Sequence, residues 1–180
     1  MAQRQLDQVF GGGGDFLRPV TTADLSQLTM IDAIVKETLR LFPTAPVGTR
    51  LAAEDIPLAG GRYIAPRGCC VFLAFYLLHR NPELFPDPDK FDPGRFLPGG
   101  SATSRRSCSY LPFSTGPRRC VGGPFATMEM KILLATLLRW FRILPGSSRE
   151  ELESISFSVT SHPLTGYRVS FIPREIQSFK

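Results

Sequence analysis

The chain has 180 residues, of which 43% are hydrophobic and 21% charged, a balance that suits a globular domain with a buried core. No apolar stretch approaches the ~18 residues that a membrane-spanning helix needs, and no apolar signal segment opens the chain, so we expect neither an anchor nor export. The formal net charge of +5 would suit an anionic membrane or an acidic protein partner; no nucleic-acid-binding motif is visible, so no nucleic-acid partner is expected.

Residues 1–20 are predicted to form a flexible, Gly-rich N-terminal segment, followed by a domain over residues 21–180. The run Gly11–Gly14 carries this prediction, because glycine loses more conformational entropy on ordering than any other residue.

A helix is predicted to begin near Thr22 and to end before Pro43. Its apolar face recurs at helical spacing and comprises Leu25, Leu28, Ile31, Ile34, Val35 and Leu39. Within this helix Glu37 and Arg40 share a face, although such pairs are common and contribute only ~0.2–0.5 kcal/mol.

Short strands broken by turns are predicted next. The candidates are Arg50–Ala52, Pro57–Leu58, Arg62–Ile64 and the β-rich apolar run Cys70–Phe75. Gly60 and Gly61 are typical of a hairpin turn. Residues 76–81 are predicted to form a short helix, and we expect His79 within it to be structural rather than a ligand.

A glycine-containing loop around Cys120 leads into a second helix, predicted from Pro124 to Trp140. The helix is apolar almost all round, which is typical of a helix buried in a larger protein. Beyond it, residues 155–157 and 167–171 alternate in polarity around a turn, which predicts a terminal hairpin with a solvated His162.

The four cysteines are Cys69, Cys70, Cys108 and Cys120, and their spacing fits neither a zinc ribbon nor a disulfide framework. Cys69 and Cys70 lie in the apolar run and are expected in the core. A thiolate that must bind a buried metal needs a setting like that of Cys120, where glycines let the backbone bend closely around the sulfur and a helix begins just beyond it.

Three segments resemble, in order, the motifs of the cytochrome P450 family of heme-thiolate monooxygenases. Residues 113–122 match the cysteine loop F-x-x-G-x-R-x-C-x-G at every fixed position. Residues 36–43 read K-E-T-L-R-L-F-P and resemble the family's E-x-x-R helix, and residues 91–96 match its F-x-P-x-R-F segment. The resemblance runs from about Thr21 to Pro173 and is closest to eukaryotic microsomal members of family 4.

The resemblance implies an α+β, mainly helical fold that corresponds to the C-terminal portion of a cytochrome P450. It implies that Cys120 is the axial ligand of the heme b iron and that Arg118 pairs with a propionate. It further implies that Phe113 packs near the sulfur and that Gly116 and Gly122 permit the backbone path of the loop.

Two further sets of residues follow from the resemblance. Arg50 is either a second propionate-binding residue or a surface strand residue, and residues 45–49 would border the substrate pocket. Glu37, Arg40 and Arg95 would form a structural triad, because one buried carboxylate held by two guanidiniums keeps its charge compensated.

The function implied is insertion of one oxygen atom of O2 into an organic, lipid- or fatty-acid-like substrate, with electrons from NADPH-cytochrome P450 reductase. A basic face of Arg105, Arg106, Arg119 and Lys131 would dock an acidic redox partner or would simply be solvated. The location implied is the cytosolic face of the endoplasmic reticulum membrane; a chain that exists as written would be cytoplasmic.

The chain matches only part of a complete family member. Gly12–Asp15 resembles the start of the oxygen-activating segment, but Phe16 stands where the family has threonine, so no catalytic residue is predicted and the distal helix is expected to be absent. The alternative function is therefore a truncated, non-catalytic fragment or interaction module that binds heme weakly or not at all.

Overall fold

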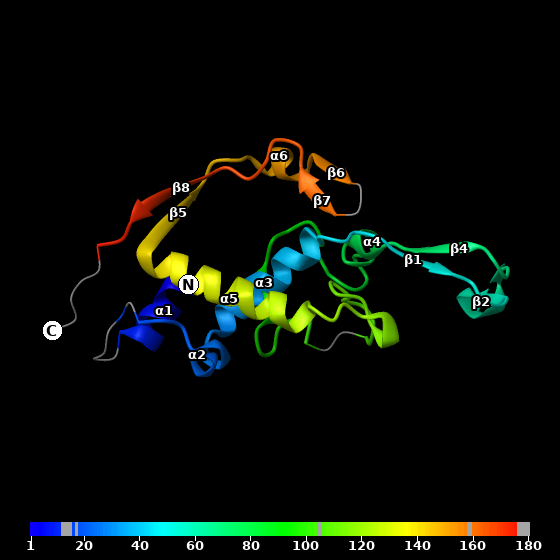
Figure 1. Ribbon diagram of the computed structural model, residues 1–180, viewed down its shortest axis with the longest axis horizontal. Helices are drawn as coiled ribbons and strands as arrows, with labels where there is room; N and C mark the ends of the chain where they lie inside the picture. Colours follow the sequence, from blue (N-terminus) through cyan, green and yellow to red (C-terminus); the bar gives the residue numbers. More distant parts are fainter. Residues whose placement is uncertain (12–15, 17, 104–105, 158–159, 176–180) are drawn as a thin grey trace.

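The computed structural model describes residues 1–11, 16, 18–103, 106–157 and 160–175 (Figure 1). The helices are α1 (Ala2–Phe10), α2 (Thr22–Gln27), α3 (Thr29–Leu41), α4 (Phe75–Leu78), α5 (Gly123–Trp140) and α6 (Arg149–Glu153). The strands are β1 (Gly48–Leu51), β2 (Ile56–Leu58), β3 (Tyr63–Ala65), β4 (Cys70–Leu73), β5 (Phe141–Pro145), β6 (Ile155–Phe157), β7 (Ser161–Pro163) and β8 (Val169–Pro173). Short 3-10 turns are formed by Ala59–Gly61, Pro93–Phe96 and Gly116–Arg118.

The hydrophobic core lies where α1, α3 and α5 meet (Figure 1). Its fully or nearly fully buried members are Leu6, Phe10, Leu28, Ile31 and Ala135. Burial of each large apolar side chain contributes roughly 1.5–3 kcal/mol, so the two residues from α1 weigh heavily in a small core.

The prediction of a flexible segment over residues 1–20 is wrong for its first half. Residues 2–10 form a helix whose Leu6 and Phe10 are 0% and 3% exposed. The sequence analysis missed this helix because the apolar residues of α1 pack against residues farther along the chain, among them Ala135 on α5. The segment Gly12–Asp15, with its resemblance to an oxygen-activating segment, lies outside the described residues.

The first predicted helix is two helices, α2 and α3, that meet at Leu28. This residue leaves the helical conformation, with φ −84° and ψ 57°, while its side chain is 0% exposed. Thr21 begins α2 with a capping box, in which its hydroxyl accepts from the Asp24 backbone N–H and the Asp24 carboxylate accepts from the Thr21 N–H.

In the part of the chain that the structure describes, the strands pair into four two-stranded antiparallel ribbons. The pairs β1–β4 and β2–β3 include the predicted hairpin, whose turn holds Gly60 and Gly61 at φ 69° and 90°. These ribbons extend away from the helical core (Figure 1), so Cys70 is exposed and Cys69 only partly buried. The prediction that both cysteines belong to the core is therefore wrong.

The predicted terminal hairpin is also wrong in its pairing. β8 pairs with β5, with Ile143 opposite Phe171, whereas β6 pairs with β7. Across the β5–β8 ribbon the rings of Phe141 and Phe171 meet edge to face, with their centroids 5.5 Å apart. This contact between distant segments stabilises the pairing of β8 with β5 in place of a local hairpin. His162 lies on β7 and is exposed.

Helix α5 runs over nearly the predicted range, from Gly123 to Trp140. One face carries Ala135 into the core, whereas Phe125 is 64% and Leu133 56% exposed in this chain. Among the described residues, none of the helices is both long and apolar enough to cross a membrane.

Candidate functional site

A buried ion cluster joins α3 to the segment around Arg95. Both Arg40 and Glu37 are 0% exposed, and Arg40 donates from Nε and Nη2 to the two Glu37 carboxylate oxygens at 2.7 and 2.9 Å. Arg95 Nε lies 3.4 Å from Glu37 Oε1, within ion-pair distance but without hydrogen-bond geometry. The three residues of the predicted triad are thus brought together, and we call Glu37, Arg40 and Arg95 the ion cluster.

The arginines of this cluster also fix the surrounding backbone. Arg40 donates to the carbonyl oxygens of His79, Pro88 and Lys90 at 2.8, 2.6 and 3.1 Å. The Asp92 N–H donates to Glu37 Oε1 at 2.8 Å. Because every partner is a fixed backbone group or an opposite charge, the cluster organises the loops that follow α4.

The loop around Cys120 closes on itself before α5 begins. The Cys120 N–H donates to the Phe113 carbonyl oxygen at 2.9 Å, which pins the two ends of the loop together. Gly116 has φ +72° and Ser114 φ +62°, so the loop path uses the left-handed region twice. That conformation costs little for glycine and more for Ser114.

Gly123, the first residue of α5, packs against Phe113. A Cβ at Gly123 would lie 3.1 Å from Phe113 Cγ, tighter than nearly all real contacts. A Cβ at Gly122 would meet only Cys120 Sγ, at 3.8 Å, an ordinary van der Waals distance. Gly123 is thus a residue that the sequence analysis missed, since the close approach of the phenyl ring is visible only in the fold.

A hollow of about 490 Å3 lies against the cysteine loop, within the range of about 300–1,000 Å3 typical of small-molecule sites. It is lined by Leu39, Thr44, Ala45, Val47, Gly48, Arg50, Phe75, Pro112, Phe113, Ser114, Arg118, Cys120, Ala126 and Met130. The lining combines an apolar wall, two guanidiniums and one cysteine sulfur. Such a lining fits a flat, largely apolar cofactor with carboxylate groups and a metal that accepts sulfur.

The hollow brings together four of the six residues predicted to bind a cofactor: Arg50, Phe113, Arg118 and Cys120. Arg50 is half-buried on β1 and donates to the Thr49 carbonyl oxygen at 2.7 Å and to Ser114 Oγ at 3.5 Å.

The other two predicted residues do not line the hollow. Gly116 forms the left-handed turn of the loop at φ +72°, and Gly122 immediately precedes α5. Within the predicted pocket border of residues 45–49, Ala45, Val47 and Gly48 face the hollow.

The predicted basic face is reduced in the structure. Lys131 Nζ lies 3.2 Å from Asp32 Oδ1 and donates to the Leu25 carbonyl oxygen at 3.0 Å. The ammonium group of Lys131 is therefore paired with groups of this chain. Arg106 and Arg119 are exposed, and Arg105 lies outside the described residues.

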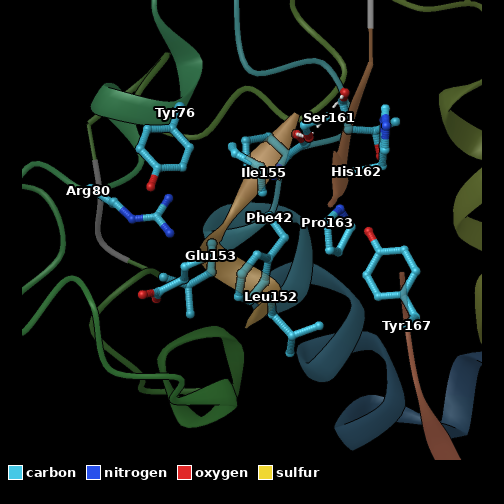
Figure 2. Close-up of a pocket in the computed structure, with 13 residues that line it drawn as sticks. Phe42, Tyr76, Arg80, Leu152, Glu153, Ile155, Ser161, His162, Pro163 and Tyr167 are labelled. Atoms are coloured by element: carbon cyan, nitrogen blue, oxygen red, sulfur yellow. Dashed lines mark hydrogen bonds between the residues drawn. The ribbon is translucent and has the colours of Figure 1, made fainter. Parts of the chain in front are cut away.

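A second, smaller cavity lies between the end of α3, α4, α6 and the β6–β7 ribbon (Figure 2). Arg80 points into it beside the Tyr76 ring, with its guanidinium carbon 3.9 Å from the ring centroid. Its volume of about 40 Å3 is less than a tenth of the hollow beside Cys120, so it is too small for a cofactor or an organic substrate.

Comparison with known proteins places this geometry in a family. The family model described as cytochrome P450 matches residues 1–168, so the chain belongs to the cytochrome P450 family. The match begins at residue 1 and so includes α1, which docks into the core.

The curated relatives belong to family 4, as the resemblance implied. The chain is 46% identical over 149 residues to cytochrome P450 4V2 of Rattus norvegicus and 38% identical over 170 residues to cytochrome P450 4g15 of Drosophila melanogaster. These alignments cover 83% and 94% of this chain but only 27% and 29% of the two relatives. The chain therefore spans less than a third of their length.

Solved structures give the same fold. A retinoic acid-bound cyanobacterial CYP120A1 matches with a TM-score of 0.82 and 31% identity, over 96% of this chain and 39% of that one. A cytochrome P450 named CYP102L1 matches with a TM-score of 0.82 and 27% identity. The α+β, mainly helical fold predicted from the motifs is thereby confirmed as part of the cytochrome P450 fold.

Proposed function

We propose that Cys120 is the axial ligand of a heme b iron bound in the hollow and that the complete protein is a monooxygenase. The observation that carries the proposal is the gathering of one cysteine sulfur, two arginines and an apolar wall around a single hollow of about 490 Å3. A thiolate-ligated heme supplies oxygen-activating chemistry, because the thiolate donates electron density that favours O–O cleavage.

Residues of this chain bind and orient the cofactor in this proposal. Arg50 and Arg118 pair with the two propionates, for which a planar guanidinium is well suited. Phe113 forms an apolar wall beside the sulfur and limits the access of water. Gly116, at φ +72°, allows the left-handed turn of the loop, so that amide groups can approach the sulfur and tune it, whereas Gly122 has room for a Cβ.

The ion cluster of Glu37, Arg40 and Arg95 has a structural role in the proposal. Its members are 0%, 0% and 5% exposed and do not line the hollow, which supports a role in holding the loops rather than in contacting substrate.

We propose an apolar, lipid- or fatty-acid-like substrate and electron delivery by NADPH-cytochrome P450 reductase. The apolar wall of the hollow supports this substrate class. Arg106 and Arg119 remain as the exposed basic residues for an acidic redox partner. We further propose that the complete protein lies at the cytosolic face of the endoplasmic reticulum membrane, as the family resemblance implies.

Substitution of each cysteine in turn tests the ligand assignment. The chain is expressed, supplied with heme, reduced and exposed to carbon monoxide, and the red-shifted Soret band of a thiolate-ligated complex is recorded. We expect Cys120→Ser to abolish that band and Cys69→Ser, Cys70→Ser and Cys108→Ser to retain it. A Cys120→Ser protein that keeps the red-shifted band would contradict the assignment.

The alternative function, a non-catalytic portion that binds heme weakly on its own, is favoured by the exposed apolar side chains of α5. Heme titration of the isolated chain tests the alternative, because tight, stoichiometric binding with a thiolate spectrum would contradict it.

A further inference from the structure

We propose that His79 is a positioning residue that ties the start of the cysteine loop to the ion cluster. The proposal rests on the proposed function for what the loop does, since the loop would hold the heme ligand. It concerns a histidine that does not line the hollow and is 0% exposed.

The backbone of His79 is held from two sides. It follows α4 directly, and its N–H donates to the Phe75 carbonyl oxygen at 2.9 Å. Its own carbonyl oxygen accepts from Arg40 Nη1 at 2.8 Å. The position of His79 is therefore set by the ion cluster.

The side chain of His79 holds the loop. Its Nε2 accepts a hydrogen bond of 2.8 Å from the backbone N–H of Leu111. A backbone N–H can only donate, so Nε2 carries no proton and the proton of the neutral ring sits on Nδ1. The Tyr110 ring packs beside the imidazole at 5.3 Å and limits its rotation.

Two further hydrogen bonds connect Leu111, and through it His79, to Cys120. The Leu111 carbonyl oxygen accepts from the Ser114 N–H at 3.2 Å, and the Phe113 carbonyl oxygen accepts from the Cys120 N–H at 2.9 Å. Ser114 sits between these bonds at φ +62°, a conformation that persists only where the surroundings enforce it. Removal of the His79 acceptor would release the turn that brings Phe113 to Cys120.

Hydrogen exchange with mass spectrometry on the dilute chain tests the proposal through three variants. His79→Leu fills much of the ring's volume and removes the acceptor, and His79→Gln supplies an amide oxygen at about the reach of Nε2. Tyr110→Phe keeps the ring beside His79 and removes only the hydroxyl that donates to the Lys36 carbonyl oxygen at 2.9 Å.

We expect amides of residues 111–122 to exchange about five- to tenfold faster in His79→Leu, and close to the wild-type rate in His79→Gln and Tyr110→Phe. Exchange that rises equally in α3 and α5, or not at all, would overturn the proposal, because a merely structural histidine would loosen the whole fold. If His79→Leu does not fold, the comparison of His79→Gln with wild type decides, since a released loop in the Gln variant also contradicts it.

The proposal can also be tested on the wild-type chain alone, by measuring which ring nitrogen of His79 carries the proton. Proton–nitrogen NMR correlations should show an unprotonated Nε2 at neutral pH; a proton on Nε2 would overturn the proposal.

These outcomes are independent of heme binding. Loop-confined exchange in His79→Leu, together with a red-shifted band that persists in Cys120→Ser, would leave the role of His79 intact and contradict the proposed function. The opposite pair of results would contradict only the role of His79.

Discussion

Glu37 is a carboxylate buried completely between two arginines, and at the residue scale this is where a single change should cost most. Its charge is compensated by Arg40 at 2.7 Å and by Arg95 at 3.4 Å. Loss of one partner from a buried ion cluster leaves the others desolvated and uncompensated, which is far costlier than loss of an exposed pair.

We expect Glu37→Ala to lower the free energy of unfolding by ~3–5 kcal/mol, because it strands two buried cations. The measurement is denaturant unfolding followed by circular dichroism. Glu153→Ala is the control, since it breaks a half-exposed pair with Arg149 at 2.7 Å and should cost less than ~1 kcal/mol. Equal costs for the two variants would show that the ion cluster does not stabilise the fold.

The two glycines at the start of α5 give a second prediction at this scale. Gly123→Ala should lower the free energy of unfolding by ~1–3 kcal/mol, because its Cβ would press on Phe113 at 3.1 Å. Gly122 has φ −79° and room for a Cβ, so Gly122→Ala should lower the free energy of unfolding by less than ~1 kcal/mol. Thermal unfolding of the two variants side by side checks this order, and the reverse order would contradict the packing described for the loop.

At the scale of the element, the start of α2 couples stability to pH. Asp24 is buried and accepts two hydrogen bonds of 2.8 Å from Arg18. The Arg18 guanidinium holds the pKa of this carboxyl well below its usual range, with help from the Thr21 hydroxyl and backbone N–H and against the opposing effect of burial. The ionised form is therefore the one that caps α2.

Because the folded pKa of Asp24 is depressed, its contribution to stability is fully present above the unfolded pKa of about 3.9 and is lost as pH falls toward the folded value. We expect Asp24→Asn to be less stable than wild type at pH 7 and the difference to shrink steadily below about pH 4. Unfolding curves across this range check the slope. A difference that stays constant with pH would contradict the role given to the ionised carboxylate.

At the scale of the whole molecule, the described chain leaves large apolar side chains uncovered. On α5 they include Phe125 and Leu133, 64% and 56% exposed, and on the β1–β4 ribbon Leu51 and Phe72, 74% and 69% exposed. Monomeric proteins rarely expose contiguous apolar patches beyond a few hundred Å2.

We therefore expect the 180-residue chain by itself to self-associate as its concentration rises, to hold heme weakly, and to show no monooxygenase turnover with NADPH and a reductase. Sedimentation, heme titration and a turnover assay on a fatty acid and a small aromatic test the three points. Phe125→Lys with Leu133→Lys should reduce the association without loss of helix content. A monomer that oxygenates either compound faster than free heme would overturn this expectation.

Much of the local structure could be predicted from the sequence. The period of apolar residues placed α5 within one residue of its observed start, and Gly60 with Gly61 predicted the β2–β3 turn, because both signals lie within a short stretch of chain. The residues around Cys120 predicted a loop just before α5, again from a short stretch of chain, and its role in cofactor binding stays a prediction.

Only the tertiary structure decided the features that depend on contacts between distant residues. Three such features are the pairing of β5 with β8, the packing of Leu6 and Phe10 near Ala135, and the hydrogen bond from Lys131 to Leu25. Each joins segments that are distant in the sequence, so no short stretch of residues predicts it. The sequence by itself predicted Cys120 as the metal ligand and Glu37, Arg40 and Arg95 as a structural triad. The fold decided what surrounds these residues. The burial of the ion cluster, the hollow beside Cys120 and the hydrogen bond from the Leu111 N–H to His79 arise only when separate segments pack together.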